Sequence, residues 1–293
     1  NSGVLTNNNS LVNEFGVLKG TITNVGTIDN NGTFINKSIF MSTNIFNNYN
    51  IFKIYFNGTL TTTNTLKNDS TFINYGSVTN SGTIRTNSEF KNYGTLSMSV
   101  GSLLVNSSNF TNFNTGVSNA DTTADNIDLT GITPTITNNA IINHSSGHMI
   151  NKGTLTSNKS LQISNLFSNH SILTNSNKIR INTSGTLNNS GSLTNQFGDS
   201  TLITNYGALS NVIVSETEKG TLTNNARIIN ETTGTMKNYH IFTNDSSVIN
   251  KNIFKNYLVA NFTTNKLFEN HSTLNNYGTL KNTLTMKNET GTF

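Results

Sequence analysis

The chain has 293 residues, a formal net charge of +4, 11% charged residues, a single proline and no cysteine. The lack of cysteine excludes disulfides and thiolate metal sites, and the scattered lysines form no dense basic patch of the kind that binds nucleic acid. No apolar stretch is long enough to span a membrane. Although 33% apolar content is low, disordered chains are rich in charge or proline, which this chain is not. The composition therefore predicts a thin, regular core built from strand and turn residues.

A six-residue repeat runs through most of the chain: an apolar residue, any residue, Asn, any residue, Gly or Ser, and then usually Thr. Its apolar slot is filled first at Ile22, Ile28, Phe34, Phe40, Phe46 and Phe52, and then at Leu60, Leu66, Phe72, Val78, Ile84, Phe90 and Leu96. Each hexad accommodates one short strand and one bend, in which Asn and Gly tolerate positive φ. Three hexads predict a triangular coil of about 18 residues, which is one turn of a parallel β-helix.

Like residues 18 positions apart support this coil length. The pairs are Phe34 and Phe52, Phe72 and Phe90, Tyr75 and Tyr93, and Tyr239 and Tyr257. The same spacing places Asn74 over Asn92 and Asn238 over Asn256, where stacked amides are expected to form ladders. With some coils widened to 19 or 20 residues, we expect roughly 16 coils in all.

Two interruptions of the six-residue repeat divide the chain. We expect a β-solenoid over residues 1–114, an inserted loop over 115–135, and a continuation of the same solenoid over 136–293 with a second irregular segment at 211–221. Because the chain begins and ends inside the repeat, we read it as part of a longer protein. The first interruption carries three aspartates, Asp121, Asp125 and Asp128. Their oxygens suit Ca²⁺, but their spacing matches neither an EF-hand nor a calcium-binding β-roll, so a solvated loop is favoured.

His144 and His148 have a spacing that suits metal binding on a helix, but no helix is expected, and the repeat position of His144 accounts for it. We therefore predict no metal and no cofactor.

Most tyrosines directly follow an Asn, at a corner that should point outward. Tyr75 with Tyr93, and Tyr239 with Tyr257, are predicted to form exposed aromatic stacks. Such stacks either hold sugar rings or only stabilise each other, and the second interpretation is favoured.

Thr often precedes the apolar slot, and Thr rows on a flat face can bind ice. Here we expect Thr on every side of the coil, so β-propensity accounts for it. The sequence shows no paired carboxylates, catalytic triad or phosphate loop, and acidic residues are scarce. These features predict that the protein is not an enzyme.

Two strings carry a family resemblance: TITNVGTI from Thr21 to Ile28, and GTLNNSGSLTN from Gly185 to Asn195. They resemble the repeats of filamentous-haemagglutinin-like β-helical adhesins of bacterial or archaeal surfaces. The resemblance implies a right-handed β-helix displayed at a microbial surface. The left-handed hexapeptide helix of acyltransferases is the competing fold, but its motif places a small residue directly after the aliphatic one.

The sequence therefore predicts an all-β fold, a single-stranded parallel β-helix with triangular coils of about 18–20 residues. We expect a structural or adhesive rod of an extracellular or cell-surface protein, or a filament subunit. The expected partners are further copies of the chain and a cell-surface glycan or protein receptor, without nucleic acid or membrane insertion. A glycan-binding or glycan-cleaving β-helix, like those of tailspikes and lyases, is the alternative, and ice binding is third.

Overall fold

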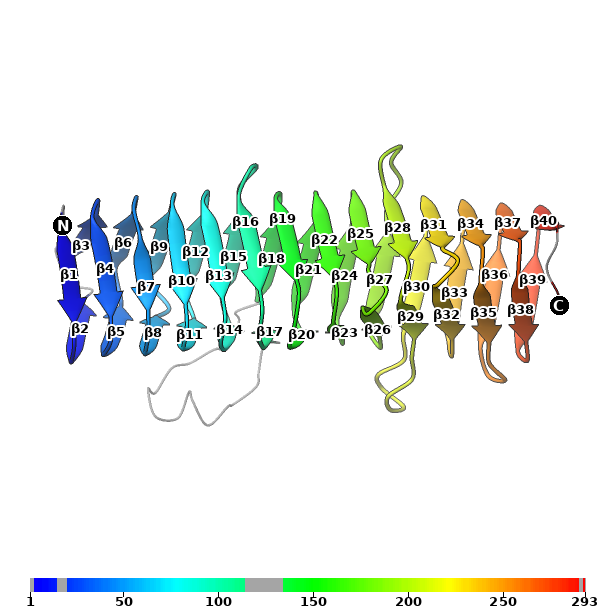
Figure 1. Ribbon diagram of the computed structural model, residues 1–293. Coiled ribbons are helices and arrows are strands. Elements are labelled where there is room, and N and C mark those ends of the chain that lie inside the picture. Colours follow the sequence, from blue (N-terminus) through cyan, green and yellow to red (C-terminus); the bar gives the residue numbers. More distant parts are fainter. Residues whose placement is uncertain (1–2, 15–19, 114–133, 290–291, 293) are drawn as a thin grey trace. The chain divides into compact units, whose positions relative to one another are not determined.

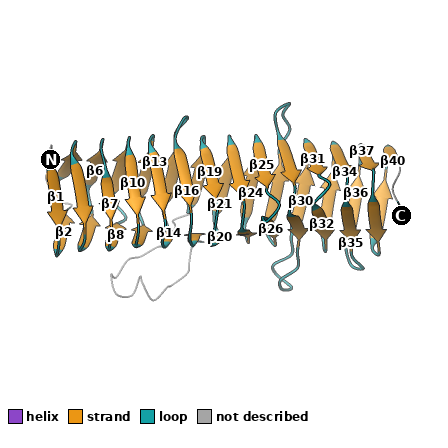
Figure 2. Cartoon of the chain, viewed as in Figure 1, coloured by secondary structure: helices purple, strands orange, loops and turns teal. Residues whose placement is uncertain are grey.

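The computed structural model describes residues 3–14, 20–113, 134–289 and 292. Short strands joined by bends and loops make up this part of the chain, and it contains no helix (Figures 1 and 2). The strands form about 13 turns of a parallel β-solenoid with three strands in each turn. The fold class predicted from the hexad is therefore confirmed.

The chain divides into two compact units. The first comprises residues 1–147 and 152–154, and the second comprises 148–151 and 155–293. Each unit has three parallel sheets, which we name A1, B1 and C1 in the first unit and A2, B2 and C2 in the second.

The strands of the first unit follow one another through the three sheets in turn. Sheet A1 contains β1 (Val4–Asn7), β4 (Thr27–Asn30), β7 (Phe46–Asn48), β10 (Thr65–Asn68), β13 (Thr83–Thr86), β16 (Leu103–Asn106) and β19 (Ile141–His144). Sheet B1 contains β2 (Ser10–Asn13), β5 (Thr33–Asn36), β8 (Ile51–Ile54), β11 (Thr71–Asn74), β14 (Phe90–Asn92) and β17 (Phe110–Asn112). Sheet C1 contains β3 (Thr21–Asn24), β6 (Ile39–Ser42), β9 (Thr59–Thr62), β12 (Ser77–Asn80), β15 (Thr95–Met98) and β18 (Thr135–Asn138).

The second unit repeats this order. Sheet A2 contains β22 (Ser160–Ile163), β25 (Lys178–Ile181), β28 (Leu202–Asn205), β31 (Arg227–Asn230), β34 (Ser247–Asn250), β37 (Leu267–Asn270) and β40 (Thr285–Asn288). Sheet B2 contains β20 (His148–Asn151), β23 (Leu166–Asn169), β26 (Thr186–Asn189), β29 (Ala208–Asn211), β32 (Thr235–Asn238), β35 (Ile253–Asn256) and β38 (Thr273–Asn276). Sheet C2 contains β24 (Ile172–Asn175), β27 (Ser192–Asn195), β30 (Thr221–Asn224), β33 (Ile241–Asn244), β36 (Asn261–Thr264) and β39 (Thr279–Asn282), and β21 (Thr154–Ser157) has residues in both units.

A typical strand holds four residues, of which the second and fourth point into the coil. In β4 the buried residues are Ile28 and Asn30, and Thr27 and Asp29 are half-buried on the outside. This alternation follows from the two-residue period of a strand. The Asn of the hexad therefore ends the strand and faces inward, whereas the sequence analysis placed it in the bend.

The apolar slot fills the interior with aromatic rings from all three sheets. Phe34, Phe40, Phe46 and Phe52 come from four successive strands, and their ring centroids lie 4.8 to 6.1 Å apart. Along sheet B1, Phe72 stacks on Phe90 with centroids 4.4 Å apart. Such contacts stabilise a core beyond the area that it buries.

The number of turns differs from the expected 16, because many turns are longer than 18 residues. Asn74 and Asn92 occupy equivalent places 18 residues apart, whereas Asn195 and Asn224 are 29 apart. The additional residues lie in the corners, and the strands keep their register. Extra corner length therefore lowers the number of turns without disturbing the core.

The glycines of the small slot allow the backbones of successive turns to pack closely. Among the described glycines, only Gly101 and Gly147 have positive φ. A Cβ atom built on Gly76 would lie 2.2 Å from the carbonyl oxygen of Gly58 in the preceding turn, and one on Gly94 would lie 2.1 Å from that of Gly76. Here the residue is small because neighbouring backbones approach closely, whereas the sequence analysis invoked positive φ.

Candidate functional site

The inward Asn side chains form hydrogen-bonded ladders within each unit. Asn74 Nδ2 donates to Asn92 Oδ1 at 2.7 Å and to the carbonyl oxygen of Thr95 at 3.0 Å, and Asn74 Oδ1 accepts from the Gly76 N–H at 3.1 Å. In the second unit, Asn238 Nδ2 donates to Asn256 Oδ1 at 2.8 Å. All four ladder Asn residues named in the sequence analysis are at most 1% exposed. Their amide groups are occupied by the coil, so they hold the structure and bind no ligand.

The corner that follows sheet B1 carries a column of aromatic residues. Tyr75 stacks on Tyr93 with ring centroids 5.0 Å apart, Tyr93 stacks on Phe113 at 4.2 Å, and Tyr55 contacts Tyr75 edge-on at 6.3 Å. Tyr75 and Tyr93 are only 1% exposed. The predicted exposed stack is wrong at these two residues, because Phe113 and the outward Ile73 pack with them in a hydrophobic cluster.

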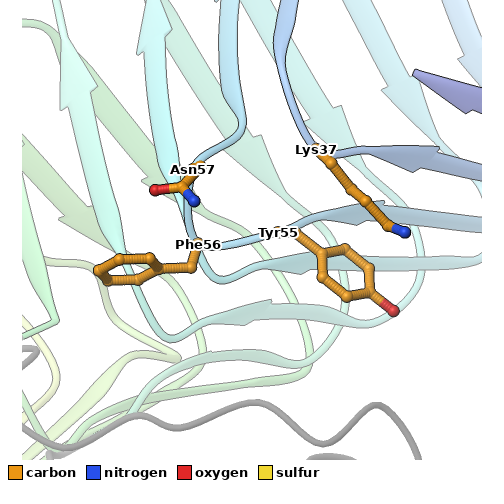
Figure 3. A pocket seen from close by; sticks show the side chains of 4 residues that line it. All are labelled: Lys37, Tyr55, Phe56 and Asn57. Atoms are coloured by element: carbon orange, nitrogen blue, oxygen red, sulfur yellow. The ribbon is translucent and has the colours of Figure 1, made fainter. Parts of the chain in front are cut away.

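A small cavity of about 150 Å³ lies at the Tyr55 end of this column and is lined by Lys37, Tyr55, Phe56 and Asn57. Figure 3 shows Lys37 beside the Tyr55 ring, while Phe56 points away from both. Lys37 Nζ lies 5.5 Å from the centre of that ring and 3.1 Å from Glu14 Oε1. The ring and the carboxylate already contact this ammonium group, so we assign no ligand to the cavity.

The corresponding corner of the second unit carries the other predicted stack. Tyr239 and Tyr257 are half-buried and lie parallel, with ring centroids 4.0 Å apart and an interplanar angle of 10°. Tyr277 continues the column at 6.5 Å and is 60% exposed. Burial, together with a hydrogen bond between the Tyr239 phenol and Tyr257, raises the pKa of Tyr239 to about 12. Tyr277 is therefore the accessible ring of this corner.

Residues 212–220 leave the coil beside this corner as a short hairpin. The Gly220 N–H donates to the Val212 carbonyl at 2.8 Å, and the Val214 N–H donates to the Glu218 carbonyl at 2.9 Å. A cavity of about 530 Å³ lies against the hairpin. Its lining residues are Ile213, Ser215, Glu216, Lys219, His240 and Val259. It combines apolar walls with one acid, one amine and one imidazole, a combination typical of small-molecule sites.

The two histidines weighed as metal ligands have other roles. His144 is buried and takes the place of Asn in the ladder of sheet A1, with Nδ1 2.9 Å from Asn106 Nδ2. His148 Nε2 lies 2.9 Å from Ser168 Oγ within the second unit. Burial, and to a lesser degree the charge of His170, lowers the pKa of His148.

Within the described ranges, no three His, Asp or Glu side chains group closely enough to hold a metal ion. The low-ranked calcium candidates Asp121, Asp125 and Asp128 lie outside the described residues, as does most of the predicted loop at 115–135. No helix suited to crossing a membrane occurs in the described part of the chain.

Sequence reasoning missed Tyr55 and Phe113 as members of the aromatic column. Tyr55 precedes Tyr75 by 20 residues, and Phe113 follows Tyr93 by 20. A search for aromatic residues at both 18 and 20 positions would have joined all four. The two spacings alternate because the intervening corners differ in length.

Comparison with family models, with curated proteins and with solved structures finds no match to this chain.

Proposed function

We propose that the chain is the structural or adhesive solenoid of an extracellular or cell-surface protein. The observation that carries the proposal is the use of the coil interior, where the second and fourth residues of successive strands contact their counterparts one turn away. Asn and apolar layers fill this space, so recognition is left to the outer faces and corners. A repeating coil stabilised by its neighbours suits a spacer, because its length grows with each added turn.

We further propose that the chain acts without catalysis and that its partners include other copies of itself. Neutral Asn, Thr and Ser dominate its surface corners, and the charges that do occur are often paired across turns. Lys251 Nζ lies 3.1 Å from Glu231 Oε2, and Lys287 Nζ lies 3.4 Å from Glu269 Oε1. Pairing of this kind neutralises these lysines and makes them less available to bind a charged substrate.

Electron microscopy of the native full-length protein, combined with antibody labelling of intact cells, tests this proposal. We expect elongated particles or fibres of constant width and labelling without permeabilisation. Compact particles, or labelling that requires permeabilised cells, would contradict it.

Glycan binding is the second candidate, and the Tyr239–Tyr257–Tyr277 column beside the hairpin cavity favours it. Sugar rings stack on aromatic faces, and Tyr277 is the most accessible of the three. Glycan-array binding that is lost in Tyr277→Ala and kept in Tyr49→Ala would support this function. Tyr49 is a suitable control because it is also an exposed corner tyrosine, in the first unit. If the array shows no binding, glycan binding is excluded and the structural function is the one that remains.

A further inference from the structure

The outer faces of sheets C1 and C2 differ in composition from the other faces of the coil. On each four-residue strand the first and third residues point outward. In the three-residue strands β7, β14 and β17 the middle residue is the outward one and is counted as the third position. In sheets C1 and C2 the third residue is Thr or Ser on every described strand except β6 and β39. These residues are Thr23, Thr61, Thr79, Ser97 and Thr137 in C1, and Thr174, Thr194, Thr223, Thr243 and Thr263 in C2.

The other two faces of the coil serve as an internal control. At the third position Thr occurs only at Thr6 and Thr204 in sheets A1 and A2, and only at Thr111 in sheets B1 and B2. All these positions lie on parallel strands of three or four residues. β-Propensity therefore acts equally on the three faces and does not explain why Thr collects on one of them. The Thr that precedes the apolar slot does lie on all three faces, for example at Thr27, Thr33 and Thr21. The enrichment on one face is confined to the third position.

Charge shows the same separation. Lys281 of β39 is the only charged residue in the described strands of sheets C1 and C2. The other faces carry charges at the third position, including Lys67, Arg85 and Arg180 in the A sheets and Lys53, Lys91, Lys237 and Lys255 in the B sheets. One face in each unit is thus neutral and rich in hydroxyl groups.

The strand register arranges these hydroxyls in straight rows. In C1, Thr61 pairs with Thr79, Thr79 with Ser97, and Ser97 with Thr137, and a second row runs beside it through Thr59, Ser77, Thr95 and Thr135. In C2, one row runs through Thr174, Thr194, Thr223, Thr243 and Thr263. The third-position side chains in both rows are half-buried, so each presents part of its surface to solvent.

The rows repeat at the spacing of the strands. Paired strands lie about 4.8 Å apart, and the first and third residues of one strand are separated by about 6.7 Å. A layer of water or of other hydroxyl groups that binds these rows would therefore be held at the repeat of the strands.

We propose that the C1 and C2 faces bind ice. Ice presents an uncharged and periodic layer of hydroxyl donors and acceptors, and each C face offers a periodic array of hydroxyl groups that is almost free of charge. Each Thr also carries a methyl group, whose apolar surface restricts the orientations of nearby water. A glycan or an unrelated globular protein has no fixed repeat at the spacing of the strands, whereas an ice lattice can engage every row at once. A second copy of this chain shares the repeat, and the light-scattering readout below distinguishes that case.

This function is independent of the structural role. The experiment measures thermal hysteresis of the purified chain and its incorporation into a slowly growing ice surface. A Lys on the C face should interrupt the row of hydroxyl groups, and its charge should orient the nearby water differently. The double variant Thr79→Lys/Thr223→Lys places one Lys at the middle of each array.

The control is Thr111→Lys/Asn188→Lys, which adds the same two charges at third positions of sheets B1 and B2. We expect thermal hysteresis in the unmodified chain and in the control, and its loss to the level of buffer in the C-face variant. Circular dichroism of all three must show the same β content, so that misfolding does not imitate the result.

Absence of thermal hysteresis in the unmodified chain would overturn the proposal, as would equal activity in the two double variants. Light scattering provides a second readout. A particle mass that halves only in the C-face variant would show that the face joins two copies of the chain, and would also overturn ice binding. Neither result would contradict the proposed structural function, which depends on the coil interior and on cell-surface labelling.

Discussion

Asn224 donates a hydrogen bond from Nδ2 to Oδ1 of Asn244, one turn further along sheet C2, at 2.7 Å. The same amide accepts from Asn195 Nδ2 at 2.7 Å and also donates to the carbonyl oxygen of Ser247 at 2.9 Å. One buried side chain thus joins three successive turns and a neighbouring strand.

Replacing Asn224 by Ala should therefore destabilise the second unit. The substitution leaves the buried Asn195 donor and Asn244 acceptor without this partner, which costs about 1–3 kcal/mol of unfolding free energy. Asn225→Ala is the matched control, because Asn225 is the next residue and lies at the corner, half-buried. Its effect should stay within about 0.5 kcal/mol. Denaturant unfolding followed by circular dichroism measures both, and equal effects would show that the ladder contributes nothing particular.

Close stacking at the small slot makes Gly76→Ala destabilising. The added methyl group would lie within 2.4 Å of the carbonyl oxygens of Gly58 and Tyr55, so the backbone must move. Overpacking of this kind costs about 1–3 kcal/mol. Gly3→Ala provides the comparison, since nothing lies within 4 Å of a Cβ built there. A melting temperature that falls only in Gly76→Ala is expected, and an unchanged one would refute the close-approach explanation.

The environment of His148 makes the second unit sensitive to acid. Because burial lowers the pKa of His148 below its ordinary value of 6.5, the unfolded chain takes up the proton more readily than the folded chain. The stabilisation is complete above pH 6.5 and declines as the pH falls from there through the pKa of the folded state. His148→Gln should flatten this decline in denaturant midpoints between pH 8 and pH 5. Parallel curves for the two proteins would exclude His148 as the cause.

Tyr239 should titrate later than an ordinary tyrosine. Its pKa is raised from 10.0 to about 12 by burial and by Tyr257, so the folded chain keeps this phenol protonated longer than the unfolded chain does. Its contribution to stability is present below pH 10 and is lost as the pH rises towards 12. Ultraviolet absorbance of the phenolate should show a late phase that disappears in Tyr239→Phe. Persistence of that phase would assign it to another tyrosine.

The hexad was enough to predict the coil, because the apolar slot and the Asn slot recur in nearly every strand. Phe72 with Phe90, and Lys237 with Lys255, are paired as the spacing of 18 requires. The direction of the Asn side chain was less accessible, since a residue at the end of a strand and one in the bend share the same local pattern. The inward direction of the Asn74 side chain becomes clear only from its hydrogen bond to Asn92 in the structure.

The composition of each face could not be read from the hexad alone. Corners of different length change the number of residues per turn, so Thr194 pairs with Thr223 at a separation of 29 residues, while Thr61 pairs with Thr79 at 18. If a constant turn length is assumed, residues of different sheets are assigned to the same face, and Thr then appears evenly distributed. The burial of Tyr75 and Tyr93 was hidden for the same reason, since Phe113 joins them only through a longer turn.

The freedom of the corners has a consequence for engineering. Strand pairing is unchanged across the hairpin at residues 212–220, where Leu193 still meets Leu222. A foreign peptide placed in such a corner would extend into solvent while the paired strands on either side fix its two ends. Because turns recur at a regular rise, peptides inserted at the same corner of several turns would be displayed at fixed distances from one another.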